Sequence, residues 1–195
     1  MDVRVTTDIS AEPILKAEMR NYLEFTATDT TEDTLIESMI KSARIMLEKR
    51  MNIAVAEKTL TVLFRAGEVI NDSVILPYSP FIAITSVKAV DTQGTKTTLT
   101  LNSTYFKRGI NNLEIYISYN GTGIGVGSNI SGSDIEVIYT CGYGNAGTET
   151  LPETIRELIR RQVKIWYLRE DDTNTIDLSM SIKQGADLLS NNVWL

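Results

Sequence analysis

Cys141 is the only cysteine in the 195-residue chain, and the sequence contains no histidine. A catalytic thiol needs a neighbouring group that lowers its pKa, and histidine usually supplies this base. Histidine is also the commonest general base and the commonest metal-binding imidazole. Cys141 ends a segment of alternating apolar residues, so we expect a buried structural side chain. With one cysteine no intrachain disulfide can form, which fits a reducing compartment.

Acidic residues cluster twice, at Asp29, Glu32 and Asp33 and again at residues 170–172. Paired carboxylates can hydrolyse glycosides, and several together can bind a metal ion. Neither cluster has the regular Asp spacing of a calcium loop. The first precedes a predicted helix, where acidic residues are favoured, and the second follows one. We therefore predict no catalytic residue, no metal site and no cofactor.

A glycine-rich stretch lies at residues 120–133 and contains Gly121, Gly123, Gly125 and Gly127. Such loops can cradle phosphates where a helix begins. The dinucleotide fingerprint would need glycine at Val126 or Ser128, and no Gly-Lys-Ser/Thr sequence is present. No predicted helix follows the glycines. We interpret the stretch as a long loop, of a length that is typically functional or mobile.

Three basic residues recur at every fourth position near the C-terminus: Arg156, Arg160 and Lys164. Such a row can face an acidic protein surface or a nucleic acid backbone, or it can form a solvated helix face balanced by Glu153 and Glu157. The chain carries 19 basic and 25 acidic residues, a net charge of -6. Nucleic acid binding through phosphates needs clustered positive charge, so we favour the solvated face over DNA. A protein partner remains an equal alternative.

Apolar spacing predicts helices within residues 10–51 and 151–169. In the first region Ser10 is a candidate cap and Pro13 is tolerated in the first turn, before a polar break at 26–33. The first short helix should bury Ile14, Leu15, Met19, Tyr22 and Leu23. The second has an apolar stripe made of Leu35, Ile36, Met39, Ile40, Ala43, Met46 and Leu47.

Charged residues of this second helix should form its other face, with pairs Glu37–Lys41 and Arg44–Glu48 four residues apart. The last helix has Thr150 as a candidate cap and Pro152 near its first turn. Its expected stripe is Ile155, Leu158, Ile159, Gln162, Val163, Trp166 and Tyr167.

Between about residues 57 and 141 the apolar residues alternate, which predicts antiparallel strands with one buried face. Segments 82–90 and 96–101 flank the polar residues 91–94 and predict a hairpin. Helices, then strands, then a helix is the pattern of an α+β domain. No apolar run is long enough to cross a bilayer, and we see no secretory signal.

The C-terminal tail, residues 173–195, is polar at first and ends in Val193, Trp194 and Leu195. A tryptophan between two aliphatic residues is costly to leave in water. It either folds back on its own domain or anchors in another subunit, because aromatic residues are common interface hot spots.

The order of these segments resembles the head–tail connector, or adaptor (head-completion), proteins of long-tailed double-stranded DNA bacteriophages. The likeness covers roughly residues 14–170. It is carried by the helix DTLIESMIKSARIMLEKR at 33–50, by ILPYSPFIAITSV at 75–87, and by IEVIYTCGYG at 135–144 followed by LPETI at 151–155 and WYLRE at 166–170. The loop at 120–133 and the tail depart from the family pattern.

The resemblance implies a helical bundle of two N-terminal helices and one long C-terminal helix, with a small antiparallel sheet, in a domain spanning residues 1–172. It implies a virion neck subunit, made in the host cytoplasm, that forms a dodecameric ring under the portal. DNA would pass through its channel unread, and a stopper or tail-completion protein would bind the far side. No enzyme activity and no membrane association are implied.

For such a ring we expect the 120–133 loop to make intersubunit or axial contacts, and the tail with Trp194 to dock on the portal. Two other interpretations remain. One is a different tail or baseplate interaction module, and the other is a small carboxylate-dependent hydrolase, which would gather several acidic residues in one pocket.

Overall fold

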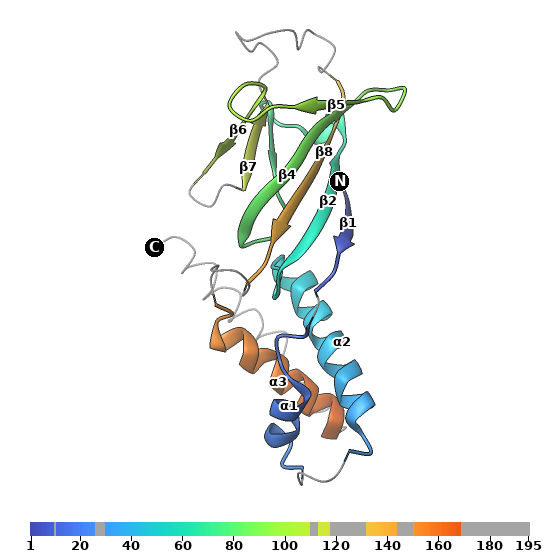
Figure 1. Ribbon diagram of the computed structural model, residues 1–195, viewed down its shortest axis with the longest axis vertical. Coiled ribbons are helices and arrows are strands. Elements are labelled where there is room, and N and C mark those ends of the chain that lie inside the picture. Colours follow the sequence, from blue (N-terminus) through green and yellow to red (C-terminus); the bar gives the residue numbers. More distant parts are fainter. Residues whose placement is uncertain (10, 26–29, 110–112, 118–131, 144–149, 169–195) are drawn as a thin grey trace. The chain divides into compact units, whose positions relative to one another are not determined.

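The computed structural model describes residues 1–9, 11–25, 30–109, 113–117, 132–143 and 150–168. These residues form an α+β fold with three α-helices and two antiparallel sheets (Figure 1). The chain divides into two compact units. The sheet unit comprises residues 1–9 and 52–149, and the helical unit comprises residues 10–51 and 150–195. The α+β class and the three helices are confirmed, whereas the single small sheet that we expected is two sheets.

The larger sheet has five strands in the order β1-β2-β8-β4-β5, each antiparallel to its neighbours. Its strands are β1 (Asp2–Thr7), β2 (Lys58–Phe64), β8 (Asp134–Cys141), β4 (Phe81–Val90) and β5 (Lys96–Leu99). In Figure 1, β8 lies between β2 and β4 although it is the last strand of the chain. Strand β1 was missed in the sequence, where we expected only helices before residue 51.

The smaller sheet has three strands in the order β3-β7-β6. These are β3 (Ser73–Ile75), β7 (Glu114–Ile117) and β6 (Tyr105–Arg108), again antiparallel. A short 3-10 helix, η1 (Ala66–Glu68), stands between β2 and β3 in the chain.

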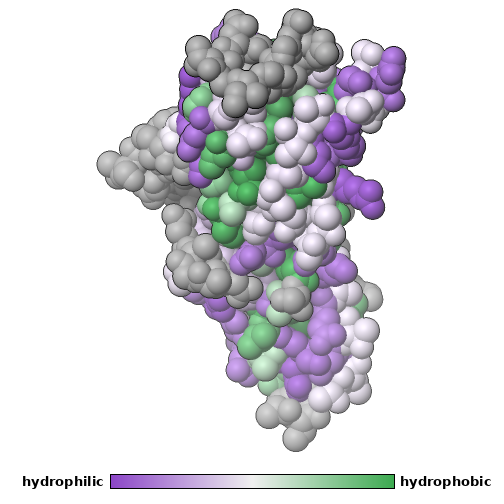
Figure 2. Space-filling model, turned by 45° about the horizontal axis from the view of Figure 1, so that its top comes forward, coloured by the Kyte–Doolittle hydropathy of each residue, from purple (hydrophilic) through white to green (hydrophobic). Residues whose placement is uncertain are grey.

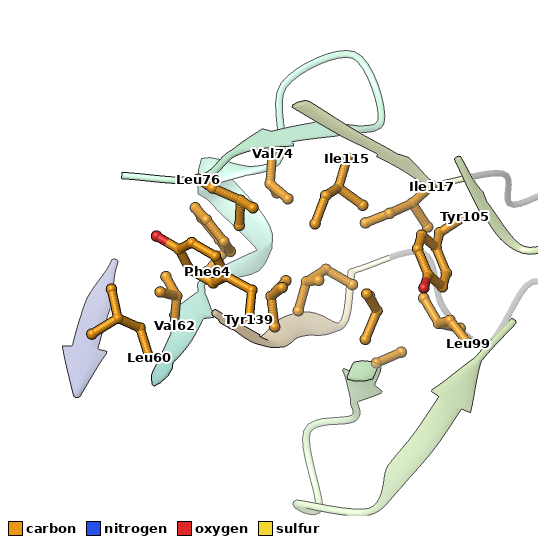
Figure 3. Close-up of a cluster of buried hydrophobic side chains, with 14 of the residues drawn as sticks. Leu60, Val62, Phe64, Val74, Leu76, Leu99, Tyr105, Ile115, Ile117 and Tyr139 are labelled. Atoms are coloured by element: carbon orange, nitrogen blue, oxygen red, sulfur yellow. The ribbon is translucent and has the colours of Figure 1, made fainter. Parts of the chain in front are cut away.

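The core of the sheet unit lies between the two sheets. Alternate residues of β2 and β8 are buried and the residues between them are half-buried, because successive side chains of a strand point to opposite faces of the sheet. Figure 3 shows Val74, Ile115 and Ile117 of the smaller sheet pointing toward side chains of the larger one, among them Val62 and Tyr139. Each aliphatic side chain buried in this way stabilises the fold by about 1.5–3 kcal/mol.

Tyr139 is fully buried in this core and brings a hydroxyl group into it. The hydroxyl accepts a hydrogen bond from the backbone N–H of Tyr78 at 3.1 Å. Burial raises the pKa of Tyr139, so the phenol stays neutral. Cys141 is fully buried at the end of β8, which confirms the burial and the strand-end position that we expected for it.

The hairpin predicted around residues 91–94 is confirmed, since β4 and β5 pair from Val87·Leu99 to Val90·Lys96. Asp91 organises its loop, because one carboxylate oxygen accepts the backbone N–H groups of Gln93 and Thr95, both at 2.8 Å. The hydrogen bond from the Thr95 N–H is the main reason why the pKa of Asp91 lies below its ordinary value.

The helical unit contains α1 (Lys16–Tyr22), α2 (Asp33–Met51) and α3 (Glu153–Leu168). The predicted stripe of α3 is confirmed from Ile155 to Val163. The stripe of α2 is confirmed at Ile36, Ile40, Ala43 and Leu47. No helix in the described ranges is long and apolar enough to cross a membrane.

Three expectations about these helices were wrong. Leu35, expected in the apolar stripe of α2, is 47% exposed, because it lies in the first turn of the helix. Leu15, expected in the core, is 66% exposed, because α1 begins only at Lys16 and Leu15 precedes it. Arg44 and Glu48, expected on a solvated face, are 1% and 4% exposed. They do form the expected pair, with Nη1 of Arg44 donating to Glu48 at 3.1 Å. Arg44 also donates from Nε to Glu12 at 2.8 Å, and this second carboxylate permits its burial.

Candidate assembly surfaces

The basic row of α3 faces α1 of the same chain. Arg156 donates to Glu18 at 2.9 Å, and Arg160 donates to the same carboxylate from Nε at 3.0 Å. The ammonium of Lys164 lies 5.7 Å from the centre of the Tyr22 ring. Glu18, in the same helical unit, is therefore one acidic partner of this basic row. A contact of the same row with a partner remains a prediction.

The Glu18 cluster should make the helical unit sensitive to acid. Burial raises the pKa of Glu18, but the hydrogen bonds from Arg160 and Arg156 outweigh it, and the net pKa lies below its ordinary value. A carboxylate with a lowered pKa contributes stability that is present above about pH 4.5 and is lost as pH falls through its folded value. We expect Glu18→Gln to lower the free energy of unfolding by about 1–2 kcal/mol at pH 7.

Urea unfolding at pH 7 and near pH 3 tests this prediction. The difference between wild type and Glu18→Gln should shrink at low pH, because the protonated wild-type carboxyl then resembles the amide. Glu37→Gln is the matched control, since the Glu37 side chain is 56% exposed and pairs only with Lys16 among the described residues. A pH-independent difference at Glu18 would show that packing rather than charge sets its contribution.

A groove of about 410 Å³ lies in the helical unit, between the segment that precedes α1 and the middle of α2. Buried Ile14 and Ile40 line it together with the exposed Leu15. Its charged lining residues are Glu12, Lys16, Glu37 and Lys41. Glu12 is held by Arg44, and Glu37 by Lys16 at 2.9 Å. Both carboxylates form ion pairs. The groove therefore has an apolar part formed by Ile14, Leu15 and Ile40, and charged residues line the rest of it.

The outer face of the smaller sheet carries aromatic and aliphatic side chains. Strand register places Ile70, Ser73, Tyr116 and Phe106 in one row across it. Ile70 is 70% exposed, and the Phe106 and Tyr116 rings lie 6.3 Å apart. Arg108 stacks on the Tyr116 ring at 3.7 Å from its centre. Half-buried rings beside an exposed isoleucine are typical of protein-binding faces.

The edge of the larger sheet at β1 is a third exposed surface. All six residues of β1 are exposed, including Val3 at 40% and Val5 at 47%. Figure 2 shows hydrophobic residues reaching the surface of the protein among polar ones. An uncovered edge strand presents backbone N–H and C=O groups that can pair with another strand.

Reactive groups are not gathered in the part of the chain that the structure describes. It contains no group of three or more His, Cys, Asp or Glu residues that could hold a metal ion. Asp33 of the first acidic cluster pairs with Lys16 at 3.1 Å. Several residues singled out in the sequence lie outside the described residues. They are residues 170–172, the glycines Gly121, Gly123, Gly125 and Gly127, and the terminal Val193, Trp194 and Leu195. Their predicted contacts remain predictions, as does the domain boundary at residue 172.

Solved structures share this fold, although no protein-family model matches the sequence and no curated protein is significantly similar to it. A chain in the neck of an empty gene transfer agent (GTA) particle, computed with C6 symmetry, matches with a TM-score of 0.72 and 18% identity over 95% of both chains. A chain in the virion of a native GTA particle matches with a TM-score of 0.69 and 19% identity over 94% of both.

A further chain, in the neck of a native GTA particle computed with C12 symmetry, matches with a TM-score of 0.68 and 18% identity. The match covers 95% of the present chain and 94% of that one. At such identities the likeness establishes the fold. The likeness to connector proteins in the sequence is thus matched by a fold shared with chains of GTA necks. None of these three structures is described as an enzyme.

Proposed function

We propose that the chain is a structural subunit of a phage-type virion neck, where copies form a ring that joins the capsid portal to the tail and lines the DNA channel. The observation that carries this proposal is the fold shared with neck chains over 95% of the sequence. The C6 and C12 symmetries of those necks support a multimer, and a dodecamer is the form that the sequence resemblance implies.

The charge of the chain supports the same role. A net charge of -6 gives a channel wall little means of holding phosphates, and DNA that must slide should not be held by contacts that release counterions. Two residues of the basic row on α3, Arg156 and Arg160, pair with Glu18 and are less available for such contacts. DNA would therefore not be held through its phosphates, and the sequence resemblance implies that it also passes unread.

In this proposal the portal binds one side of the ring and a stopper or tail-completion protein binds the other. The terminal residues Val193, Trp194 and Leu195 would dock on the portal, and the 120–133 loop would contact neighbouring copies or the channel axis. The row formed by Arg156, Arg160 and Lys164 would be a secondary contact, because its charge is partly neutralised within the chain.

Mixing the purified chain with the portal protein encoded beside it, followed by electron microscopy, tests the proposal. The expected result is a ring stacked on the portal. A portal that stays bare, together with assembled particles whose necks lack the chain, would refute it. Binding to another tail component and not to the portal would instead identify a tail or baseplate module.

A further inference from the structure

Strand β1 is an open edge whose apolar side chains are left uncovered by the described residues. Asp2 to Val5 pair regularly with Leu63 to Leu60 of β2, and the register shifts only beyond Val5. Val3 and Val5 lie beside Val62 and Leu60, on the face of the sheet that carries the core. Four of the six residues of β1 are valine or threonine, and the strand has neither proline nor lysine, which usually protect such edges.

The other face of β1 carries charge. Asp2 pairs with Arg65 at 2.8 Å, and Thr6 contacts Thr61 at 2.7 Å. Arg4 has no ion-pair partner within the described ranges, although it lies between these two residues on the same face. A strand that completes this edge should therefore offer apolar residues on one face and a carboxylate on the other.

Residues 176–182 of the chain, IDLSMSI, have this pattern. Ile176, Leu178, Met180 and Ile182 alternate strictly with Asp177, Ser179 and Ser181. Such alternation is typical of a strand with one buried face, and a strand of this kind needs a sheet edge to pair with. If Asp177 lies opposite Arg4, then Ile176 and Leu178 lie beside Val3 and Val5, whichever way the strand runs.

We propose that residues 176–182 of one copy add to β1 of the neighbouring copy as an extra strand. The assignment to a neighbour rests on the proposed ring, since a ring closes when each copy offers two different surfaces, here an edge and a tail. Seven residues separate Leu168, the end of α3, from Ile176, and the eight Cα-to-Cα steps between these two residues can span at most about 27 Å. The terminal Trp194 lies twelve residues beyond Ile182 and stays available for the portal.

A designed disulfide tests the pairing. In the variant Arg4→Cys/Asp177→Cys the two Cα atoms would lie about 4.5–5.5 Å apart across neighbouring copies, a separation that permits a disulfide. Rings assembled on the portal and then oxidised should give a ladder of covalent oligomers on a non-reducing gel. The matched control is Thr98→Cys/Asp177→Cys, because Thr98 is exposed on β5, the other edge of the same sheet. The buried Cys141 is common to both variants.

Each result decides a separate question. A ladder from the first variant and none from the control supports the pairing. Rings without a ladder, or an internal disulfide within single chains, overturn it and leave the proposed function intact. Wild-type chain that forms no ring on the portal overturns the proposed function instead.

A charge placed on the edge gives a second test. In Val5→Lys, the lysine should raise the concentration needed for ring assembly by about tenfold or more, because it adds a charge to the apolar side of the new strand pair. Leu35→Lys on α2 is the control, since Leu35 and Val5 are both 47% exposed. Circular dichroism would verify that both variants fold. Equal assembly of the two variants would contradict the proposal.

Discussion

Replacing Gly142 by alanine should lower the free energy of unfolding by about 4 kcal/mol or prevent folding altogether. Gly142 follows β8 with a φ of +127°, a backbone conformation that L-residues rarely adopt. A Cβ at this position would lie 2.5 Å from the carbonyl carbon of Ala56 and 2.7 Å from the nitrogen of Glu57. These are backbone atoms at the entrance to β2, so they cannot move aside as a side chain would.

Two other glycines separate the causes of this loss. Gly94→Ala should cost only about 1 kcal/mol, because Gly94 has a φ of +85° but open space around it. Gly67→Ala should change stability by less than about 0.5 kcal/mol, since nothing lies within 4 Å and its φ is ordinary. Urea unfolding of the three variants measures the series. A loss at Gly94 equal to that at Gly142 would mean that conformation alone, and not the backbone clash, sets the cost.

Strands with strict alternation and a fully buried face were predictable from the sequence. Ile135, Val137 and Tyr139 of β8 are buried as expected, because their period of two matches the pleat of a sheet that covers a core. Alternation assigns faces but not partners. It could not show that β8 pairs with β2 and β4, or that the strands divide into two sheets, since those pairings join residues far apart in the sequence, from Lys58 with Cys141 to Val90 with Asp134.

Strand β1 was missed although its alternation is present in Asp2, Val3, Arg4 and Val5. Only two of its residues are aliphatic, and both stay exposed, so the pattern lacks the burial that makes other strands recognisable. The same exposure marks β1 as a candidate interface. The exposure of Val3 and Val5 thus explains both why β1 was missed in the sequence and why a second copy of the chain is a reasonable source of its partner strand.

The candidate contact residues show a similar limit. The row Arg156, Arg160 and Lys164 was recognised by its spacing, but its neighbour was not. Glu18 and Tyr22 stand four residues apart on α1 and match the spacing of the row, which is the pattern that identifies them in retrospect. Charge on a helix thus indicates a need for a partner without saying whether the partner is water, another chain or the same chain.

Arg44 was assigned to the solvated face because it is charged, although it follows Ile40 by four residues and so lies on the buried side of α2. Its burial depends on Glu48 and on Glu12, which comes from the segment before α1. Because the two carboxylates satisfy the guanidinium from different elements, the arginine joins that segment to α2. Spacing alone reveals the position of Arg44 but not the second carboxylate.

Arg44→Met should therefore destabilise the helical unit by about 3–5 kcal/mol, because it leaves the 5% exposed Glu48 side chain as a buried charge without its arginine partner. Arg161→Met is the matched control and should cost less than about 1 kcal/mol, since the Arg161 side chain is 62% exposed in its pair with Glu157. Urea unfolding at pH 7 measures both.

The double variant Arg44→Met/Glu48→Leu identifies the source of the loss. It should recover most of the stability, because well-packed apolar residues can replace a buried ion pair at little cost, and the remaining Glu12 is partly exposed and can be hydrated. The coupling energy from this double-mutant cycle then reports the buried carboxylate and not the size of the side chains. A double variant as unstable as Arg44→Met would show instead that the packing of the long arginine side chain holds this part of α2 in place.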